Sequence, residues 1–190
     1  MKIKPASILF LFLIATLSFS CIDEGQTLDA IFEKDVKAIA EYVDASDMVN
    51  VKELIDPVTG ISIIWQEVSG SGSVITRGDT IAADYTGRFL NDVVFDSSID
   101  SVARANNIFR PQGIYVPIRF RTSSDVDGNR QPRVIPGFEL GLLQLERGDK
   151  ATIIIPSELA YGNDARQGIP QNSVLIFEVE LFEVKTGPQQ

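Results

Sequence analysis

Apolar residues recur at two different spacings along this chain, and each spacing predicts a different kind of element. Between residues 28 and 45 they recur every three or four positions with charged residues between them, which predicts one amphipathic helix. Further along, apolar and polar residues alternate, which is typical of strands that bury one face. We therefore predict strands over residues 61–68, 80–89 and 174–184, and a short, wholly apolar strand over 151–155.

The alternation also predicts which face of each strand is buried. The expected inward residues are Ile61, Ile63 and Trp65 in the first strand, Ile81, Ala83 and Tyr85 in the second, and Leu175, Phe177, Val179 and Leu181 in the last. Between the strands, Phe138, Leu142 and Leu145 fit one face of a short helix. Several strands with one short helix predict an α+β fold in which an antiparallel β-sheet curls around that central helix, preceded by the amphipathic helix.

Two stretches have no clear pattern. Residues 99–116 and 122–133 are polar and contain Pro111, Gly113 and Gly128. Both are expected to be loops inserted near the functional site.

The first residues are arranged like an export signal. A basic start is followed by a nearly unbroken apolar run over residues 8–19 and then by Cys21. The run is short for a membrane-spanning helix, and a cysteine at this point resembles the lipobox of bacterial lipoproteins. We therefore expect a signal peptide over 1–20 and a lipid anchor on Cys21 that holds the chain on a bacterial envelope membrane. An ordinary cleaved signal with an incidental cysteine is the alternative.

The early acidic residues Asp23 and Glu24 favour the outer membrane, and leave open whether the chain faces the periplasm or the cell surface. These observations divide the chain into a signal peptide over 1–20, an anchor linker with the amphipathic helix over 21–57, and a folded domain over 58–190.

Composition excludes several kinds of chemistry. The chain has no histidine and one cysteine, so Ser-His and Cys-His nucleophilic pairs and zinc sites built from these residues are excluded. The formal net charge is −9, and removing the two lysines of the leader gives −9 − 2 = −11, which argues against nucleic-acid binding. There is no glycine-rich phosphate loop. We expect no metal and no cofactor.

Five short segments carry aromatic residues in a recognisable order. They are Ala83-Asp84-Tyr85-Thr86-Gly87, Val94-Phe95-Asp96-Ser97-Ser98, Val134-Ile135-Pro136-Gly137-Phe138, Leu159-Ala160-Tyr161-Gly162 and Leu175-Ile176-Phe177-Glu178-Val179. In this order the set resembles the FKBP family of peptidyl-prolyl cis-trans isomerases, over roughly residues 58–185. The resemblance implies an FKBP-like fold and the acceleration of X-Pro rotation in secreted or envelope proteins, with proline-containing polypeptides as partners.

The resemblance also implies the roles of five residues in catalysis. Tyr85 and Phe95 match walls of the family's pocket, and Asp96 matches the acid beside the rotating bond. The backbone N–H of Ile135 is expected to contact the substrate, and the hydroxyl of Tyr161 to donate to a substrate carbonyl.

Four further residues are expected to bind the substrate. Val134 belongs to the lip of the pocket, Phe177 to its far wall, and Phe138 to its floor, where many relatives have tryptophan. Phe120 matches another wall residue. Taken without the family order, Tyr85, Phe138 and Phe177 read as ordinary core aromatics.

Two alternatives stay open at this point. The phenylalanine at position 138 and the inserted loops favour a non-catalytic FKBP-fold lipoprotein that binds peptides or acts as a chaperone. The helix over 28–45 either packs on its own domain or serves as a dimerisation or partner-binding arm that would make the protein a homodimer.

Overall fold

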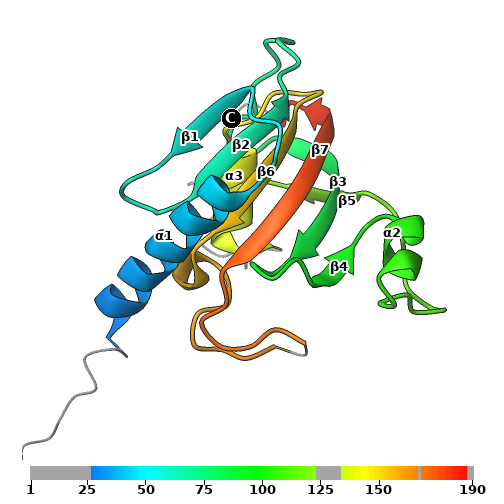
Figure 1. Cartoon of the computed structure of the whole chain (residues 1–190). Coiled ribbons are helices and arrows are strands. Elements are labelled where there is room, and N and C mark those ends of the chain that lie inside the picture. Colours follow the sequence, from blue (N-terminus) through cyan, green and yellow to red (C-terminus); the bar gives the residue numbers. More distant parts are fainter. Residues whose placement is uncertain (1–26, 123–133, 167, 188–190) are drawn as a thin grey trace, which may run out of the picture.

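The computed structural model describes residues 27–122, 134–166 and 168–187, and its centre is one antiparallel sheet (Figure 1). The strand order is β1-β2-β6-β7-β3-β4, and β5 pairs with the half of β3 that β4 leaves unpaired. The strands are β1 (Lys52–Ile55), β2 (Ser62–Glu67), β3 (Thr80–Arg88), β4 (Val94–Ser97), β5 (Ile118–Arg121), β6 (Lys150–Ile155) and β7 (Leu175–Lys185). The helices are α1 (Leu28–Ala45), α2 (Asp100–Ala105) and α3 (Pro136–Leu142), with a 3-10 turn η2 (Ser157–Leu159). The predicted α+β architecture is confirmed.

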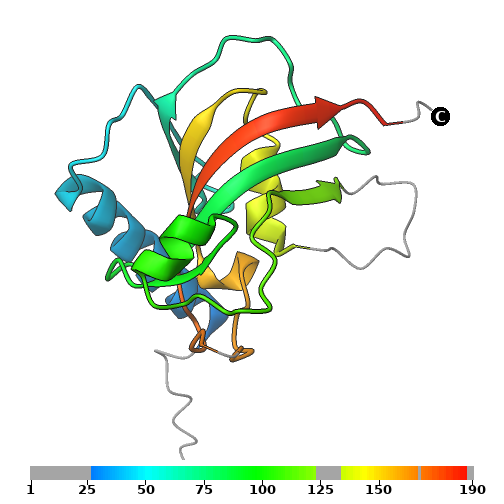
Figure 2. The ribbon, with the colours of Figure 1, turned by 90° about the vertical axis from the view of Figure 1, so that its right-hand side faces the viewer.

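The inner face of the sheet curls around α3 (Figures 1 and 2). The four inward residues predicted for β7 all lie in the inner core, together with Phe138 and Leu142 of α3. Helix and sheet approach closely because α3 carries two glycines at the contact. A side chain at Gly137 or Gly141 would collide with Ile155 or Ile153 of β6. This close approach sets the depth at which Phe138 sits.

Helix α1 covers the outer face of the same sheet. Its Ile39 packs with Ile64 of β2, Ile154 of β6 and Ile176 of β7 in a second apolar cluster. The predicted helix over 28–45 is therefore confirmed. Its Ile39 is buried against its own domain, and Tyr42 and Val43 are partly buried beside it.

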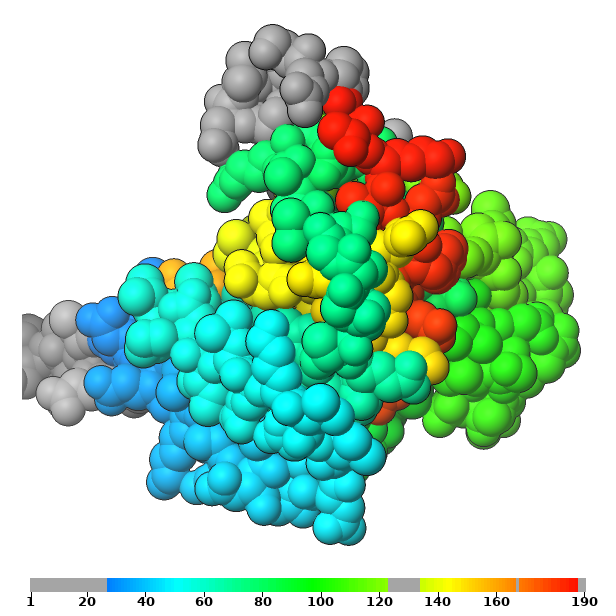
Figure 3. All heavy atoms as spheres, turned by 90° about the horizontal axis from the view of Figure 1, so that it is seen from above, coloured from blue at the N-terminus to red at the C-terminus, as the bar shows by residue number. Residues whose placement is uncertain are grey.

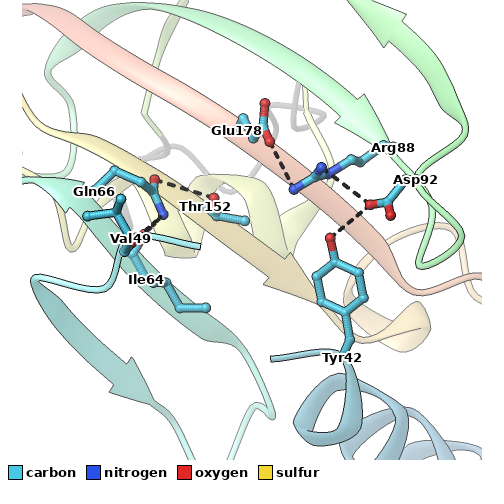
Figure 4. Close-up of polar contacts among 8 residues, drawn as sticks. All are labelled: Tyr42, Val49, Ile64, Gln66, Arg88, Asp92, Thr152 and Glu178. Carbon is cyan, nitrogen blue, oxygen red and sulfur yellow. Dashed lines mark hydrogen bonds and ion pairs between the residues drawn. The ribbon is translucent and has the colours of Figure 1, made fainter. Parts of the chain in front are cut away.

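Polar contacts extend this cover across the sheet (Figure 4). The Tyr42 hydroxyl donates to Asp92 over 2.9 Å, and the Arg88 guanidinium contacts Asp92 at 3.3 Å and Glu178 at 2.9 Å. A row of polar contacts thus links α1 to β3 and β7.

A buried carboxylate fixes the first half of α1. Asp35 is 4% exposed, and its Oδ2 accepts hydrogen bonds from the backbone N–H of Ser157 at 2.8 Å and from its hydroxyl at 2.5 Å. Ser157 begins η2, so the helix holds the start of the segment that leads to Tyr161.

The structure contains elements that the sequence analysis did not predict, among them β1, β4 and β5. The stretch 99–116 is not entirely loop, because it contains α2, a single short helix with Ala103 as its one buried residue. The residues before 58 contribute α1 and β1, which pack on or pair with the same sheet. Every residue of β1 is exposed, which left its sequence without an alternating signal.

Some predictions lie outside the described residues. These are the signal peptide, the anchor at Cys21 and nearly all of the loop over 122–133. Among the helices that the structure describes, none is both long enough and apolar enough to cross a membrane.

A second buried carboxylate joins two loops to the core. Asp149 is 2% exposed and accepts hydrogen bonds from the Trp65 indole at 2.9 Å and from the backbone N–H groups of Ser69 at 2.7 Å and Glu146 at 3.0 Å. Burial alone would raise the pKa of Asp149, but these hydrogen bonds outweigh it, and the pKa lies below its ordinary value.

Replacing Asp149 with asparagine should therefore destabilise the protein in a pH-dependent way. The carboxylate has a lower pKa in the folded state, so its contribution is fully present above the ordinary value of 3.8 and is lost as the pH falls through the folded pKa. We expect Asp149→Asn to lower the free energy of unfolding by about 1–3 kcal/mol at neutral pH, and by less in acid. Urea unfolding followed by the fluorescence of Trp65, the single tryptophan, measures both values.

The control is Asp47→Asn, which alters an exposed residue. A difference between Asp149→Asn and the wild type that is the same at neutral and acid pH would contradict the assignment.

Candidate active site

Three aromatic rings from three different elements meet on the inner side of the sheet. Phe138 of α3 and Phe177 of β7 are 3% and 8% exposed, and their centroids lie 4.8 Å apart at 57°. Tyr85 of β3 lies 6.1 Å from each of these rings and is partly exposed. These separations and tilted geometries are favourable for aromatic pairs. The predicted floor, far wall and one side wall are thus brought together.

Phe95 of β4 adds the next ring, and a glycine makes room for it. Its ring meets Phe177 edge-on, with centroids 5.9 Å apart at 89°. Gly87 lies opposite Phe177 in the pairing of β3 with β7. A Cβ atom at this glycine would lie 2.7 Å from the Phe95 ring and 3.1 Å from the Phe177 ring. The two rings therefore pack directly over the backbone of β3.

Phe89 also belongs to this group, although it was not predicted. Its ring centroid lies 4.9 Å from that of Phe95. The sequence did contain a signal, because Tyr85, Gly87 and Phe89 alternate on one face of the predicted strand.

A hydrogen bond joins the Tyr85 hydroxyl to Asp96 at the polar edge of the rings. The hydroxyl donates to Asp96 Oδ2 over 2.7 Å, while Oδ1 accepts the Ser97 backbone N–H at 3.0 Å. The backbone of Tyr85 is held in turn by Ser98, whose hydroxyl accepts the Tyr85 N–H at 2.9 Å. Burial, and then the hydrogen bond and charge of Asp96, raise the pKa of Tyr85 above its ordinary value. The phenol therefore stays protonated, and a donor, at physiological pH.

Val134 and Ile135 lie at the rim, just before α3. Both are partly buried and pack against the inner core, which contains Phe138 and Phe177. Ile135 precedes Pro136 and has the extended backbone that this position favours, and its carbonyl accepts the Phe138 N–H at 3.1 Å. Within the described residues its own N–H donates no hydrogen bond. Among the described residues this N–H thus has no partner that competes with the predicted contact to a substrate.

Tyr161 lies at the rim on the segment that follows η2. The turn is closed by hydrogen bonds from the N–H groups of Ala160 and Gly162 to the Ser157 carbonyl, at 3.0 and 2.7 Å. Tyr161 packs against the inner core, and its proximity to Tyr85 contributes to the raised pKa of Tyr85. Two tyrosines and a carboxylate thus border the same apolar surface.

Phe120 takes a different place from the other predicted residues. It is 4% exposed in the inner core and lies opposite Ile81 in the pairing of β5 with β3. It makes none of the ring contacts described above. Ile118, two residues earlier on the same face of β5, instead borders a cavity of about 250 Å³ beside Tyr85 and Asp96.

The arrangement has a limited chemical range. Among the described residues there is no group of three or more side chains of the His, Cys, Asp and Glu type placed to hold a metal ion. The site instead offers apolar ring surface, one tyrosine tied to a carboxylate, a second tyrosine and an N–H donor. Such a site is suited to binding a small apolar ring and the polar amide attached to it.

Comparison with known proteins gives the family. Residues 72–182, more than half of the chain, match the model of the FKBP-type peptidyl-prolyl cis-trans isomerases. The chain belongs to this family.

Several relatives in the family share more than this segment. The FKBP-type peptidyl-prolyl cis-trans isomerase FkpA of Escherichia coli (strain K12) is 32% identical over 177 residues, which cover 86% of this chain and 57% of FkpA. The crystal structure of FkpA from Escherichia coli superposes with a TM-score of 0.56 at 30% identity, covering 84% of this chain and 65% of that one. A peptidyl-prolyl cis-trans isomerase from Pseudomonas syringae pv. tomato DC3000 gives 0.55 at 26% identity, covering 84% and 97%. This chain thus spans little more than half the length of FkpA.

A methyl group at Gly87 should disturb the packing of the Phe95 and Phe177 rings. We expect Gly87→Ala to displace the Phe95 ring, to lower the free energy of unfolding by about 1–3 kcal/mol and to weaken the binding of proline peptides. Urea unfolding and calorimetric titration with a proline peptide measure the two effects.

A second substitution tests the cause. Phe95→Leu removes the ring atoms that the new methyl group meets, so the Gly87→Ala substitution should cost less stability in its presence. Additive effects of the two substitutions would rule out a direct collision.

Proposed function

We propose that this protein is a peptidyl-prolyl cis-trans isomerase that accelerates rotation about X-Pro bonds in polypeptides. The observation that carries this proposal is the meeting of Tyr85, Phe138 and Phe177 beside the hydrogen bond from Tyr85 to Asp96. Membership of the family supports it.

The reaction needs neither an acid, a base nor a metal. An X-Pro bond is held planar by resonance, with a barrier of about 18–20 kcal/mol, and its two forms exchange over tens of seconds or longer. Twisting the bond removes resonance and reduces the charge separation of the amide. The twisted amide is therefore less polar than the planar one, and an apolar surface from which water is excluded stabilises it relative to the ground state.

The residues of this chain divide the work between holding the ring and orienting the amide. The rings of Phe138 and Phe177 form the buried base on which a proline ring can rest, and Phe95 encloses it from the side of β4. Ile135 and Tyr161 pack against the core that contains these rings, and the proposal assigns the Ile135 N–H and the Tyr161 hydroxyl as donors to substrate carbonyls. Donors held ready for the rotated amide lower the barrier without reorganising during the reaction.

Asp96 is the positioning partner of Tyr85. Its carboxylate accepts a hydrogen bond from the Tyr85 hydroxyl and so fixes the ring against which the twisted amide turns. Its second oxygen is held by the Ser97 N–H, so the carboxylate itself has little freedom to move.

An exchange assay tests the proposal directly. Wild-type protein should accelerate cis-trans exchange of a proline peptide, measured by protease-coupled absorbance or by NMR exchange spectroscopy. Asp96→Val and Tyr161→Phe should each lower kcat/KM by about tenfold, the loss that corresponds to one hydrogen bond of about 1.4 kcal/mol.

Tyr42→Phe is the matched control, because it removes a tyrosine hydroxyl on the outer face of the sheet. Turnover by the wild type no faster than by the two site variants would argue against catalysis. Suppression of client aggregation without turnover would instead favour a non-catalytic chaperone of the same fold.

We further propose that the enzyme acts in the bacterial envelope, where its substrates would be secreted or outer-membrane proteins. The support is the basic and apolar leader and the cysteine at position 21. In this arrangement a lipid on Cys21 holds the folded domain beside the membrane.

The anchor has its own test. Wild-type chain expressed in a Gram-negative host should sediment with membranes, and its mass should correspond to a chain that begins at Cys21 and carries acyl groups. Cys21→Ala should leave the domain in the soluble fraction. A wild-type chain of unmodified mass would exclude the anchor and leave the isomerase proposal unaffected.

A further inference from the structure

We infer that Asp35, a buried carboxylate on α1, is a positioning residue for the proposed isomerase, because it holds the backbone on which Tyr161 presents its hydroxyl to the substrate. The inference rests on the proposed function and adds to it a residue of the helix that covers the opposite face of the sheet. Asp35 lies outside residues 72–182, the segment that matches the family model.

Ser157 is the residue through which Asp35 acts, because three of its groups are engaged at once. Its N–H and its hydroxyl donate to Asp35 Oδ2 at 2.8 and 2.5 Å. Its carbonyl accepts the N–H groups of Ala160 and Gly162, at 3.0 and 2.7 Å. These two residues flank Tyr161, so the backbone on both sides of the tyrosine is tied to the residue that Asp35 holds.

Apolar contacts fix α1 at the same level of the segment. Gly60, in the turn between β1 and β2, lies so close that a Cβ atom there would be 2.9 Å from Phe32 and from Val36, and 3.0 Å from Pro156. Seen from above, the residues of β1 and β2 (cyan) lie against α1 (blue) (Figure 3). Phe32 and Val36 come shortly before and directly after Asp35 along the helix. The helix therefore has little freedom to slide past the turn and Pro156.

The carboxylate makes the contact with Ser157 stiff. Among the described residues Asp35 accepts side-chain hydrogen bonds from Ser157 alone, although it is only 4% exposed. A buried carboxylate is unfavourable unless it is hydrogen-bonded, and hydrogen bonds to a carboxylate are shorter and stronger than those to a neutral acceptor. A neutral side chain in this place would cost less to bury, but it would hold Ser157 less firmly.

The proposed reaction depends on such stiffness at Tyr161. A donor lowers the rotation barrier only if it is already in place when the amide twists, and a small displacement of a positioning group lowers the rate steeply. Tyr161 lies in a turn after η2 and is only partly buried, so its place depends on how its backbone is held. The chain of hydrogen bonds from Asp35 through Ser157 supplies that support from the outer face of the sheet.

A double-mutant cycle with Tyr161 tests the inference. Asp35→Asn should lower kcat/KM for a proline peptide by about three- to fivefold, a part of the loss expected when the Tyr161 hydroxyl is removed outright. In the Tyr161→Phe background Asp35→Asn should change kcat/KM little, because its effect passes through the missing hydroxyl. Ser157→Ala, which leaves the N–H donor in place, should give the same pattern with a smaller loss. Additive effects of Asp35→Asn and Tyr161→Phe would overturn the inference.

Asp149→Asn is the matched control. Asp149 is also a buried carboxylate, 2% exposed, that accepts backbone N–H groups, but its partners are Ser69 and Glu146. The control should be less stable than the wild type and yet keep the wild-type kcat/KM under conditions where Trp65 fluorescence shows the folded state. A loss of activity in Asp149→Asn equal to that in Asp35→Asn would mean that any buried carboxylate has this effect, and would also overturn the inference.

Amide hydrogen exchange separates this inference from the proposed function. The amides of Ala160 and Gly162 should exchange faster in Asp35→Asn than in the wild type or Asp149→Asn, because their bonds to the Ser157 carbonyl open more often. An active wild type with equal exchange at these amides in all three proteins would overturn the inference alone. A wild type that does not isomerise would overturn the proposed function, whereas the exchange rates would still show whether Asp35 holds this backbone.

Discussion

Beneath α1 the central strands of this protein are apolar on both faces, and the two helices that pack on the sheet follow from the need to cover both. Ile153 and Phe177 point into the inner core, while Ile154 and Ile176, their neighbours in sequence, lie in the outer cluster. Exposing either face to water would be unfavourable, because burial of each aliphatic side chain contributes about 1.5–3 kcal/mol to the stability of the fold. Helix α3 covers the inside and α1 the outside. The ring site lies where the inner cover gives way to partly exposed side chains.

The packing of the core also forms the candidate site. The packing that buries Phe138 and Phe177 also presents their edges beside Tyr85, so the surface offered to a substrate is continuous with the core. The hydrogen bond from Tyr85 to Asp96 lies at the polar edge of this surface. Residues of the insertion after β4, which lie outside the core, line the cavity beside Tyr85 and Asp96.

Much of the fold could be predicted because buried positions repeat with the period of their element. The alternation over 174–184 gave the inward face of β7, and the spacing over 28–45 gave α1. Elements without that contrast were missed: β1 has no buried residue, and α2 has one. The family order placed Tyr85, Asp96 and the rim residues. It gave no information on the inserted residues, because contacts such as that of Phe109 with Tyr115 depend on how the insertion folds.

The buried contact between Asp35 and Ser157 joins α1 to the segment over residues 72–182 that matches the family model. The shared segment begins at residue 72, after α1, β1 and β2 have been completed. A chain trimmed to that segment would lose a paired neighbour of β6, uncover Ile154 and Ile176, and remove the acceptor that holds the turn before Tyr161. The segment matched by the family model is thus smaller than the sheet-centred body, and a truncated form that keeps these contacts begins at α1.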